Sequence, residues 1–139
     1  MNTQQQPDEK TIEAVGKVTE ALETVERARG HLYSFHQLTG SADLELGRAV
    51  DLLAEAGHHE EAERLRTELV GRNVLPGRWT FQVVEDYDAE YYAAFRELEQ
   101  GVRDRLTGGR RHLAEAAMKE DRRTHGRAHH EAAPADLRE

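Results

Sequence analysis

Apolar side chains recur at alternating intervals of three and four residues in the first third of the chain. Val15, Val18, Leu22 and Val25 carry this pattern, which is the spacing of a helix that packs along a bundle or coiled-coil seam. A proline followed by two acidic residues precedes it, as is typical of a helix start. The pattern therefore predicts a first long helix over residues 8–38.

Glycines divide the next part of the pattern into two short helices. Gly40 predicts the end of the first helix, and a second helix follows over residues 42–56, capped by a serine or by Asp43. A third helix covers residues 58–70, but its apolar positions are out of phase with those of the second. Because each residue turns a helix by about 100°, this shift predicts a kink or a hairpin turn at Gly57.

The longest predicted helix begins after the punctuated stretch GRNVLPGRWTFQ, which covers residues 71–82. Apolar residues from Val84 to Ala117 keep a spacing of three or four, so one helix is expected over residues 84–120. The pair Gly108-Gly109 lies inside it and costs about 2 kcal/mol of helix stability relative to alanine. We expect a weak point there within a continuous helix.

Four helical segments with short connections favour an all-α fold, an antiparallel helical bundle of three to four helices. Two long helices would flank a short helix-turn-helix. The expected organisation is a disordered N-terminal tail over residues 1–7, a bundle domain over residues 8–121 and a disordered polar C-terminal tail over residues 122–139.

The amino-acid composition argues against several classes of function. Hydrophobic residues make up 37% of the 139 residues and charged residues 33%, which suits long amphipathic helices with a lean core. The net charge of −8 argues against general binding to nucleic acid, whose phosphates it would repel. Without cysteine there are no disulfides or thiolate catalysis, and the cytoplasm is the expected compartment. We expect neither a secretory signal nor a membrane span.

Histidines and carboxylates offer one alternative chemistry, a metal site in the bundle. A di-iron site of the ferritin kind needs a Glu-x-x-His pair on each of two helices and further glutamates. The sequence holds one such pair, Glu55 and His58, across the expected turn. A metal site would use His58, His59 and Glu63. We expect no cofactor, because this ligand set is incomplete and exposed histidines at a helix start explain the same run.

Charge is distributed unevenly along the longest predicted helix. Residues 103–127 hold eight Lys or Arg against four Asp or Glu, a net charge of +4, whereas residues 85–99 hold six acids and one arginine, a net charge of −5. Two such helices, antiparallel and side by side, would pair opposite charges twice, which favours a homodimer that weakens with rising salt. Arg103, Arg110 and Arg111 form the expected interaction patch. Complementarity to the helix dipole is the alternative explanation.

Six of the eight aromatic residues fall within seventeen positions, from Trp79 to Phe95. The alternation in WTFQ predicts a short extended piece that lays Trp79 and Phe81 on one surface. One interpretation is a hydrophobic cap over the end of the bundle. The other is a ligand pocket in which arginines meet an anion. The pocket residues would be Arg72, Arg78, Trp79, Phe81, Tyr87 and Tyr91.

Protein–protein association by a non-catalytic homodimer is therefore the main functional hypothesis, and binding of an unidentified protein partner is a further option. No serine lies in a nucleophile motif and no Gly-rich phosphate loop is present, which disfavours an enzyme. The alternative, from a different class, is a helical metal-binding or small-molecule-binding protein with a pocket around Trp79.

Overall fold

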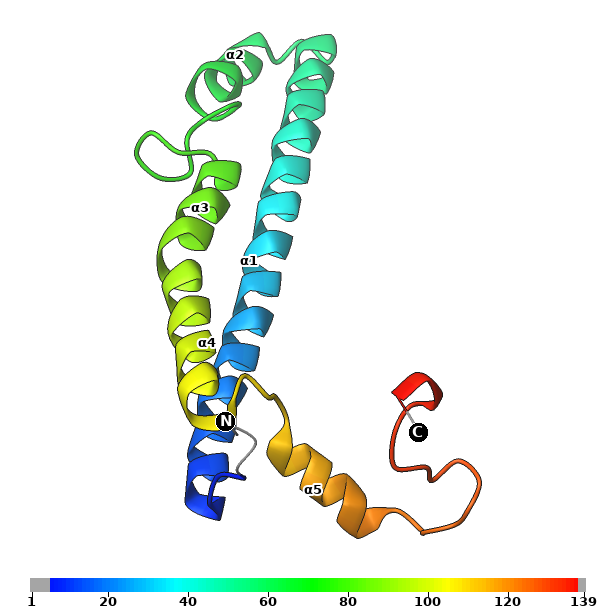
Figure 1. Cartoon of the computed structure of the whole chain (residues 1–139). Coiled ribbons are helices and arrows are strands. Elements are labelled where there is room, and N and C mark those ends of the chain that lie inside the picture. Colours follow the sequence, from blue (N-terminus) through cyan, green and yellow to red (C-terminus); the bar gives the residue numbers. More distant parts are fainter. Residues whose placement is uncertain (1–5, 138–139) are drawn as a thin grey trace. The chain divides into compact units, whose positions relative to one another are not determined.

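The computed structural model describes residues 6–137, of which 74% are helical and none forms a strand. The long helix α1 (Glu9–Glu55) is followed by α2 (His59–Glu68). A second helical rod then consists of α3 (Thr80–Tyr87), the π-helical turn η1 (Asp88–Tyr92) and α4 (Ala93–Thr107) (Figure 1). The chain continues through α5 (Leu113–Arg122) to a short 3-10 helix, η2 (Ala135–Leu137). The expected all-α helical bundle is confirmed.

Two compact units make up the chain, and in each a stretch of α1 pairs with a later segment in the opposite direction. The first unit combines Met1–Glu23 with Arg96–Glu139, and Thr19 of α1 contacts Glu99 of α4 within it. The second unit is Thr24–Phe95. Within the second unit, residues 29, 36 and 43 of α1 contact residues 88, 80 and 71, so the partner number falls as the α1 number rises. This order makes the pairing antiparallel.

Helix α1 continues through Gly40, so the predicted helix end at that residue is wrong, as is a new helix start near Asp43. A heptad explains the continuity, because residues at intervals of seven from Val15 to Val50 face inward along the whole helix. Between Leu32 and Leu46 these inward positions are polar. The apolar pattern is therefore interrupted where the helix is not, and tertiary packing offsets the helix-breaking tendency of one glycine, about 1 kcal/mol.

The polar residues at intervals of seven, Arg29, His36 and Asp43, each have a partner in the second unit. Arg29 donates two hydrogen bonds to the carboxylate of Asp88, at 2.7 and 2.8 Å. The Nδ1 atom of His36 is 2.7 Å from the hydroxyl oxygen of Thr80. The carboxylate of Asp43 accepts a hydrogen bond from the backbone N–H of Gly71 at 2.8 Å. Polar residues at heptad core positions specify register, and these three fix the register of α1 against its neighbours.

A hairpin turn at Gly57 separates α1 from α2, as the phase shift predicted. Gly57 has a φ of +90°, which is a left-handed conformation that favours glycine, and His59 begins the next helix. Ala62 of α2 is 1% exposed and is the buried residue of that helix.

The predicted continuous helix over residues 84–120 is wrong, because α4 ends at Thr107 and α5 begins at Leu113. Gly108 and Gly109 have φ values of +63° and +80°, which end a helix rather than weaken it. The backbone N–H of Gly109 donates to the carbonyl of Arg103 at 2.9 Å, closing the helix end. The apolar residues of α5 keep the spacing of those in α4, although the two helices are not continuous.

The predicted extended conformation of WTFQ is also wrong beyond its first residue. Trp79 is extended, with φ −88° and ψ 174°, but it is the N-cap of α3, and Thr80, Phe81 and Gln82 form the first helical turn. The side chain of Gln82 accepts a hydrogen bond from the Trp79 N–H at 2.8 Å. This capping contact outweighs the two-residue alternation that suggested a strand.

The predicted tails fall partly outside the described residues, which exclude 1–5 and 138–139. Asp8 caps α1, because its carboxylate accepts the N–H of Thr11 at 2.7 Å. After α5, the guanidinium of Arg123 donates to the carbonyl of His130 at 3.1 Å, so residues 123–130 turn back on the helix end. Disorder of either tail stays a prediction.

Candidate functional site

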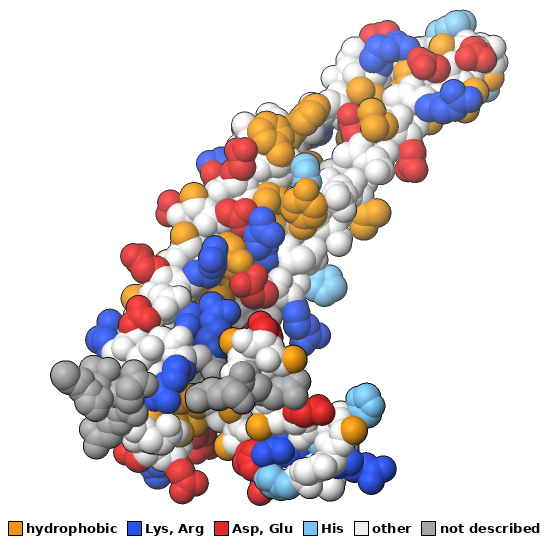
Figure 2. Space-filling model, turned by 45° about the vertical axis from the view of Figure 1, so that its right-hand side comes forward, with side chains coloured by type: hydrophobic (Ala, Val, Ile, Leu, Met, Phe, Trp, Pro, Cys, Tyr) orange, Lys and Arg blue, Asp and Glu red, His pale blue; other side chains and the backbone are white. Residues whose placement is uncertain are grey.

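An apolar groove lies in the second unit, between α1 and the loop that precedes α3. Its volume is about 1290 Å³. Residues from Phe35 to Leu46 of α1 form one wall, and the loop from Leu69 to Trp79 forms the other. We call this feature the Trp79 groove. Figure 2 shows hydrophobic side chains on the surface of the molecule, among charged ones.

The groove exists because the inward face of α1 has no helix opposite it there. Thr39, Asp43 and Leu46 occupy inward heptad positions, and all three line the groove. The α3 helix begins only at Thr80, which pairs with His36, so a loop replaces a helix along this stretch. Extending the heptad of residues 15–25 through Gly40 would have found this wall from the sequence.

Exposed apolar side chains outnumber buried ones among the described residues. Five apolar residues are buried, whereas fifteen large apolar side chains are exposed by 38% or more. Leu44 on the groove wall is 78% exposed, and nearby Leu38 is 70% exposed. A surface of this kind is typical of a protein that buries it against a partner.

The structure brings two of the six predicted pocket residues to the groove, Arg72 and Trp79. The indole N–H of Trp79 donates to the carbonyl of Gly71 at 3.1 Å, while 45% of the residue stays exposed. Trp79 therefore forms part of an open wall. It is not the buried hydrophobic cap that one interpretation of the sequence predicts. The guanidinium of Arg72 is exposed, and within residues 6–137 it has no ion-pair partner.

The other four predicted pocket residues lie outside the groove. Arg78 forms an ion pair with Asp86 at 2.5 Å, and Phe81 is 46% exposed on the first turn of α3. Tyr87 and Tyr91 have ring centroids 5.9 Å apart. They belong to an aromatic cluster that also contains Tyr92 and Phe95.

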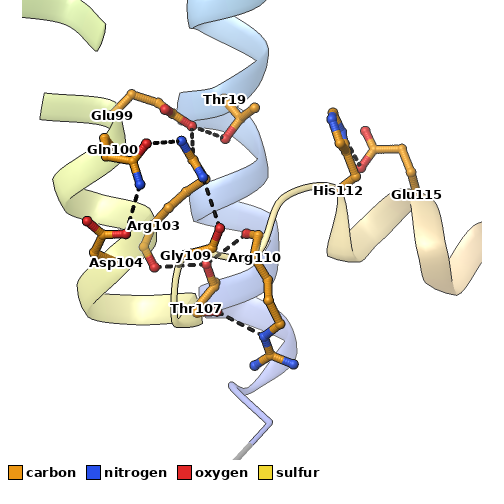
Figure 3. A network of polar contacts seen from close by, with 10 residues as sticks. All are labelled: Thr19, Glu99, Gln100, Arg103, Asp104, Thr107, Gly109, Arg110, His112 and Glu115. Atoms are coloured by element: carbon orange, nitrogen blue, oxygen red, sulfur yellow. Dashed lines mark hydrogen bonds and ion pairs between the residues drawn. The ribbon is translucent and has the colours of Figure 1, made fainter. Parts of the chain in front are cut away.

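Arg103, predicted to lie in an exposed interaction patch, is instead buried in the first unit. It is 3% exposed, and its Nε donates to the carboxylate of Glu99 at 2.8 Å. Its other nitrogens donate to the carbonyl of Gly109 at 2.9 Å and to the side-chain oxygen of Gln100 at 2.6 Å (Figure 3). Arg103 thus ties the end of α4 to the turn that follows, and its charge is not available to a partner.

The turn after α4 separates Arg110 and Arg111, the other two residues of the expected patch, from Arg103. Arg110 is half-buried, and its Nε donates to the carbonyl of Thr107 at 2.9 Å. Arg111 is exposed. The three arginines therefore do not form one exposed surface, because the chain turns at Gly108 instead of continuing as a helix.

Glu99 is a buried carboxylate that is held ionised. Burial alone would raise its pKa, but hydrogen bonds from Arg103 and Thr19, together with the charges of Arg103 and Arg111, lower the pKa below its ordinary value of 4.5. Thr19 donates to the same carboxylate oxygen at 2.7 Å. Because Thr19 lies on α1 and Glu99 and Arg103 lie on α4, this network ties the two helices together within the first unit.

The lowered pKa of Glu99 predicts a pH dependence of stability. A group whose folded pKa is depressed contributes stability above its unfolded pKa of about 4.5 and loses it as the pH falls through the folded value. Wild-type protein should exceed a Glu99→Gln variant in unfolding free energy by about 2 kcal/mol at neutral pH. The difference should shrink below pH 4.5, as measured by urea denaturation. A difference independent of pH would contradict this role.

The residues of the metal alternative are exposed. His58 and His59 lie at the start of α2, and Glu63 one turn later pairs with Arg66 at 3.0 Å. Within residues 6–137, no three His, Asp or Glu side chains gather as a metal would require. His36, by contrast, is half-buried at the edge of the core and contacts the hydroxyl of Thr80.

None of the helices in the described part of the chain combines the length and apolarity of a membrane span. Comparison with known proteins gives no relative, because no protein-family model, curated protein or solved structure matches the chain.

Proposed function

We propose that this protein acts by associating with another protein chain, and that it forms a homodimer without catalytic activity. The observation that carries the proposal is the surplus of exposed over buried large apolar side chains. Contiguous apolar surface on a soluble domain is costly to leave in water and marks interaction sites. Eleven of the fifteen exposed apolar residues belong to the second unit, which also holds the Trp79 groove.

The size of the groove supports a macromolecular occupant. Small-molecule sites are typically enclosed cavities of about 300–1,000 Å³. The Trp79 groove is larger, at about 1290 Å³, and has open walls that include a half-exposed tryptophan. Such a shape suits the apolar face of a helix better than a compact ligand.

Apolar contact, not charge pairing, is the expected basis of association. The salt-weakened dimer predicted from sequence required one helix that was acidic at its start and basic at its end. The structure ends that helix at Thr107 and buries Arg103. A dimer formed through the remaining apolar surface should persist at high salt, where electrostatic attraction is screened.

Sedimentation equilibrium tests this proposal directly. At tens of micromolar the mass should be about twice the 15.8 kDa of the chain. It should stay so between about 0.1 M and about 1 M salt, because apolar association is not weakened by screening. A monomer at all these concentrations and salts would refute self-association, and a dimer that dissociates with salt would restore the electrostatic explanation.

A further inference from the structure

We propose that residues 123–130, which follow α5, form a pH-sensitive loop that is closed at neutral pH and opens when His130 takes up a proton. This loop belongs to the first unit, and its opening is a property separate from the proposed association. Two hydrogen bonds close the loop, and one of them can form only while the imidazole of His130 is neutral.

Both closing contacts are made by His130. The guanidinium of Arg123 donates to the main-chain carbonyl of His130 at 3.1 Å, and the backbone N–H of Thr124 donates to the imidazole Nδ1 at 3.0 Å. The two donors lie where the helix ends, because Arg123 is the C-cap of α5. Between the donors and His130 the chain reverses through Gly126 and His129, whose φ values are +80° and +72°. His130 therefore holds the far end of the loop against the end of the helix.

The contact with Thr124 requires a neutral imidazole. A backbone N–H can only donate a hydrogen bond, so Nδ1 of His130 is the acceptor and the ring proton lies on Nε2. In an imidazolium both ring nitrogens carry a proton, and Nδ1 would then point a second donor at the N–H of Thr124. Closure of the loop and protonation of His130 thus exclude each other.

Falling pH favours the open loop. Histidine is the side chain whose charge ordinarily changes between about pH 5 and 8. Only the open loop leaves Nδ1 of His130 free to bind a proton. Because the open form binds more protons than the closed form, acid shifts the equilibrium towards opening, and rising pH shifts it towards closure.

The neighbouring acid–histidine pair does not reverse this direction. Hydrogen bonds from Arg123 and His125 lower the pKa of Glu120 to about 2, so this carboxylate stays ionised over the range in which histidines titrate. Nε2 of His125 lies 2.5 Å from the carboxylate of Glu120, and a proton on His125 strengthens that contact. Protonation of His125 therefore does not open the loop.

The charged side chains around His130 do not compensate an added positive charge. His130 lines a hollow of about 670 Å³ between α5 and the segment that follows it. The lining contains three cations, two carboxylates and a second histidine, so it carries no net negative charge that would hold an imidazolium in the closed loop. These residues are Lys119, Arg122, Arg123, Glu115, Glu131 and His129.

Amide hydrogen exchange measured by NMR tests the loop directly. The protection factor of the Thr124 amide compares its exchange rate with that of an unfolded chain at the same pH. It should fall at least about fivefold between about pH 7.5 and about pH 5.5. The protection factor of the Arg123 amide should change by less than about twofold, because that N–H donates to the carbonyl of Lys119 at the helix end. A Thr124 amide that is unprotected at neutral pH, or equally protected at both pH values, overturns the proposal.

Two histidine-to-asparagine variants separate His130 from its neighbour in the sequence. In His130→Asn the side-chain oxygen can accept the N–H of Thr124 but does not titrate, so the Thr124 protection factor should vary by less than about twofold over the same range. His129→Asn is the matched control, because asparagine tolerates the left-handed conformation of that residue and His130 stays in place. This variant should keep the fall of about fivefold. Loss of the pH response in His129→Asn, or its persistence in His130→Asn, would overturn the assignment to His130.

Discussion

Replacing Arg103 by methionine is expected to lower the unfolding free energy by about 3–5 kcal/mol. The substitution keeps much of the apolar stem but leaves the carboxylate of Glu99, which is 2% exposed, without its counter-charge. It also removes the hydrogen bond that holds the carbonyl of Gly109 after α4. A domain of this size has a total stability of about 5–15 kcal/mol, so the melting temperature should fall visibly.

Urea denaturation followed by circular dichroism measures this loss, with Arg105→Met as the control. Arg105 lies on the same helix and is exposed, so its substitution should cost no more than about 0.5 kcal/mol. Replacing Glu99 and Arg103 together by apolar residues should recover much of the stability, because no unpaired charge remains. Equal stability of Arg103→Met and Arg105→Met would contradict the structural role of the buried pair.

A glutamate in place of Ala62 is expected to destabilise the second unit by about 3 kcal/mol or more. Ala62 is 1% exposed, and no other residue of α2 is buried. The larger side chain and its charge have no space or partner there, so α2 must move to bring the carboxylate into water. Ala62 is therefore the most deeply buried residue of α2.

Hydrogen exchange resolves where the Ala62→Glu loss occurs. Backbone amides of residues 59–68 should exchange faster than in the wild type, while those of α4 in the first unit keep their protection. Ala94→Glu is the matched control, because Ala94 is exposed on α4 and should tolerate the same change. Unchanged protection of α2 in the Ala62→Glu protein would show that this helix is held by other contacts.

Along α1, the sequence predicts the helix where the packing residues are apolar and fails where they are polar. Gly57 was identified because the apolar phase shifts there. The same pattern predicts a helix end at Gly40 that does not exist, because His36, Thr39 and Asp43 continue the inward face without being hydrophobic. A pattern of hydrophobicity cannot distinguish a polar residue in water from one that has an intrachain partner, since the partner lies far away in the sequence.

Only part of the candidate site can be predicted from the sequence, because the other part depends on polar inward positions of α1. Arg72 and Trp79 were identified because aromatic and cationic residues cluster in a punctuated stretch. The α1 wall was missed, because it depends on the heptad continuing across Gly40. The charge of Arg103 predicts a surface position, whereas Glu99, four residues earlier on the same helix, pairs with it inside the first unit. The charge of a side chain does not show whether that side chain is exposed, because a buried charge can pair with an opposite charge on the same helix.

The π-helical turn η1 accommodates one extra residue in the second helical rod without interrupting the helix. Seven residues after the buried Val84 comes Tyr91, which is 56% exposed, while the next residue, Tyr92, lies inward and donates to Glu26 at 2.6 Å. From that point the inward positions run one residue later and continue to Glu99, because a π turn takes up more residues than an α turn. A chain one residue shorter in this segment would keep an unbroken heptad and the same inward faces. The extra residue between Asp88 and Tyr92 therefore changes the register of the second helical rod without changing which face packs against α1.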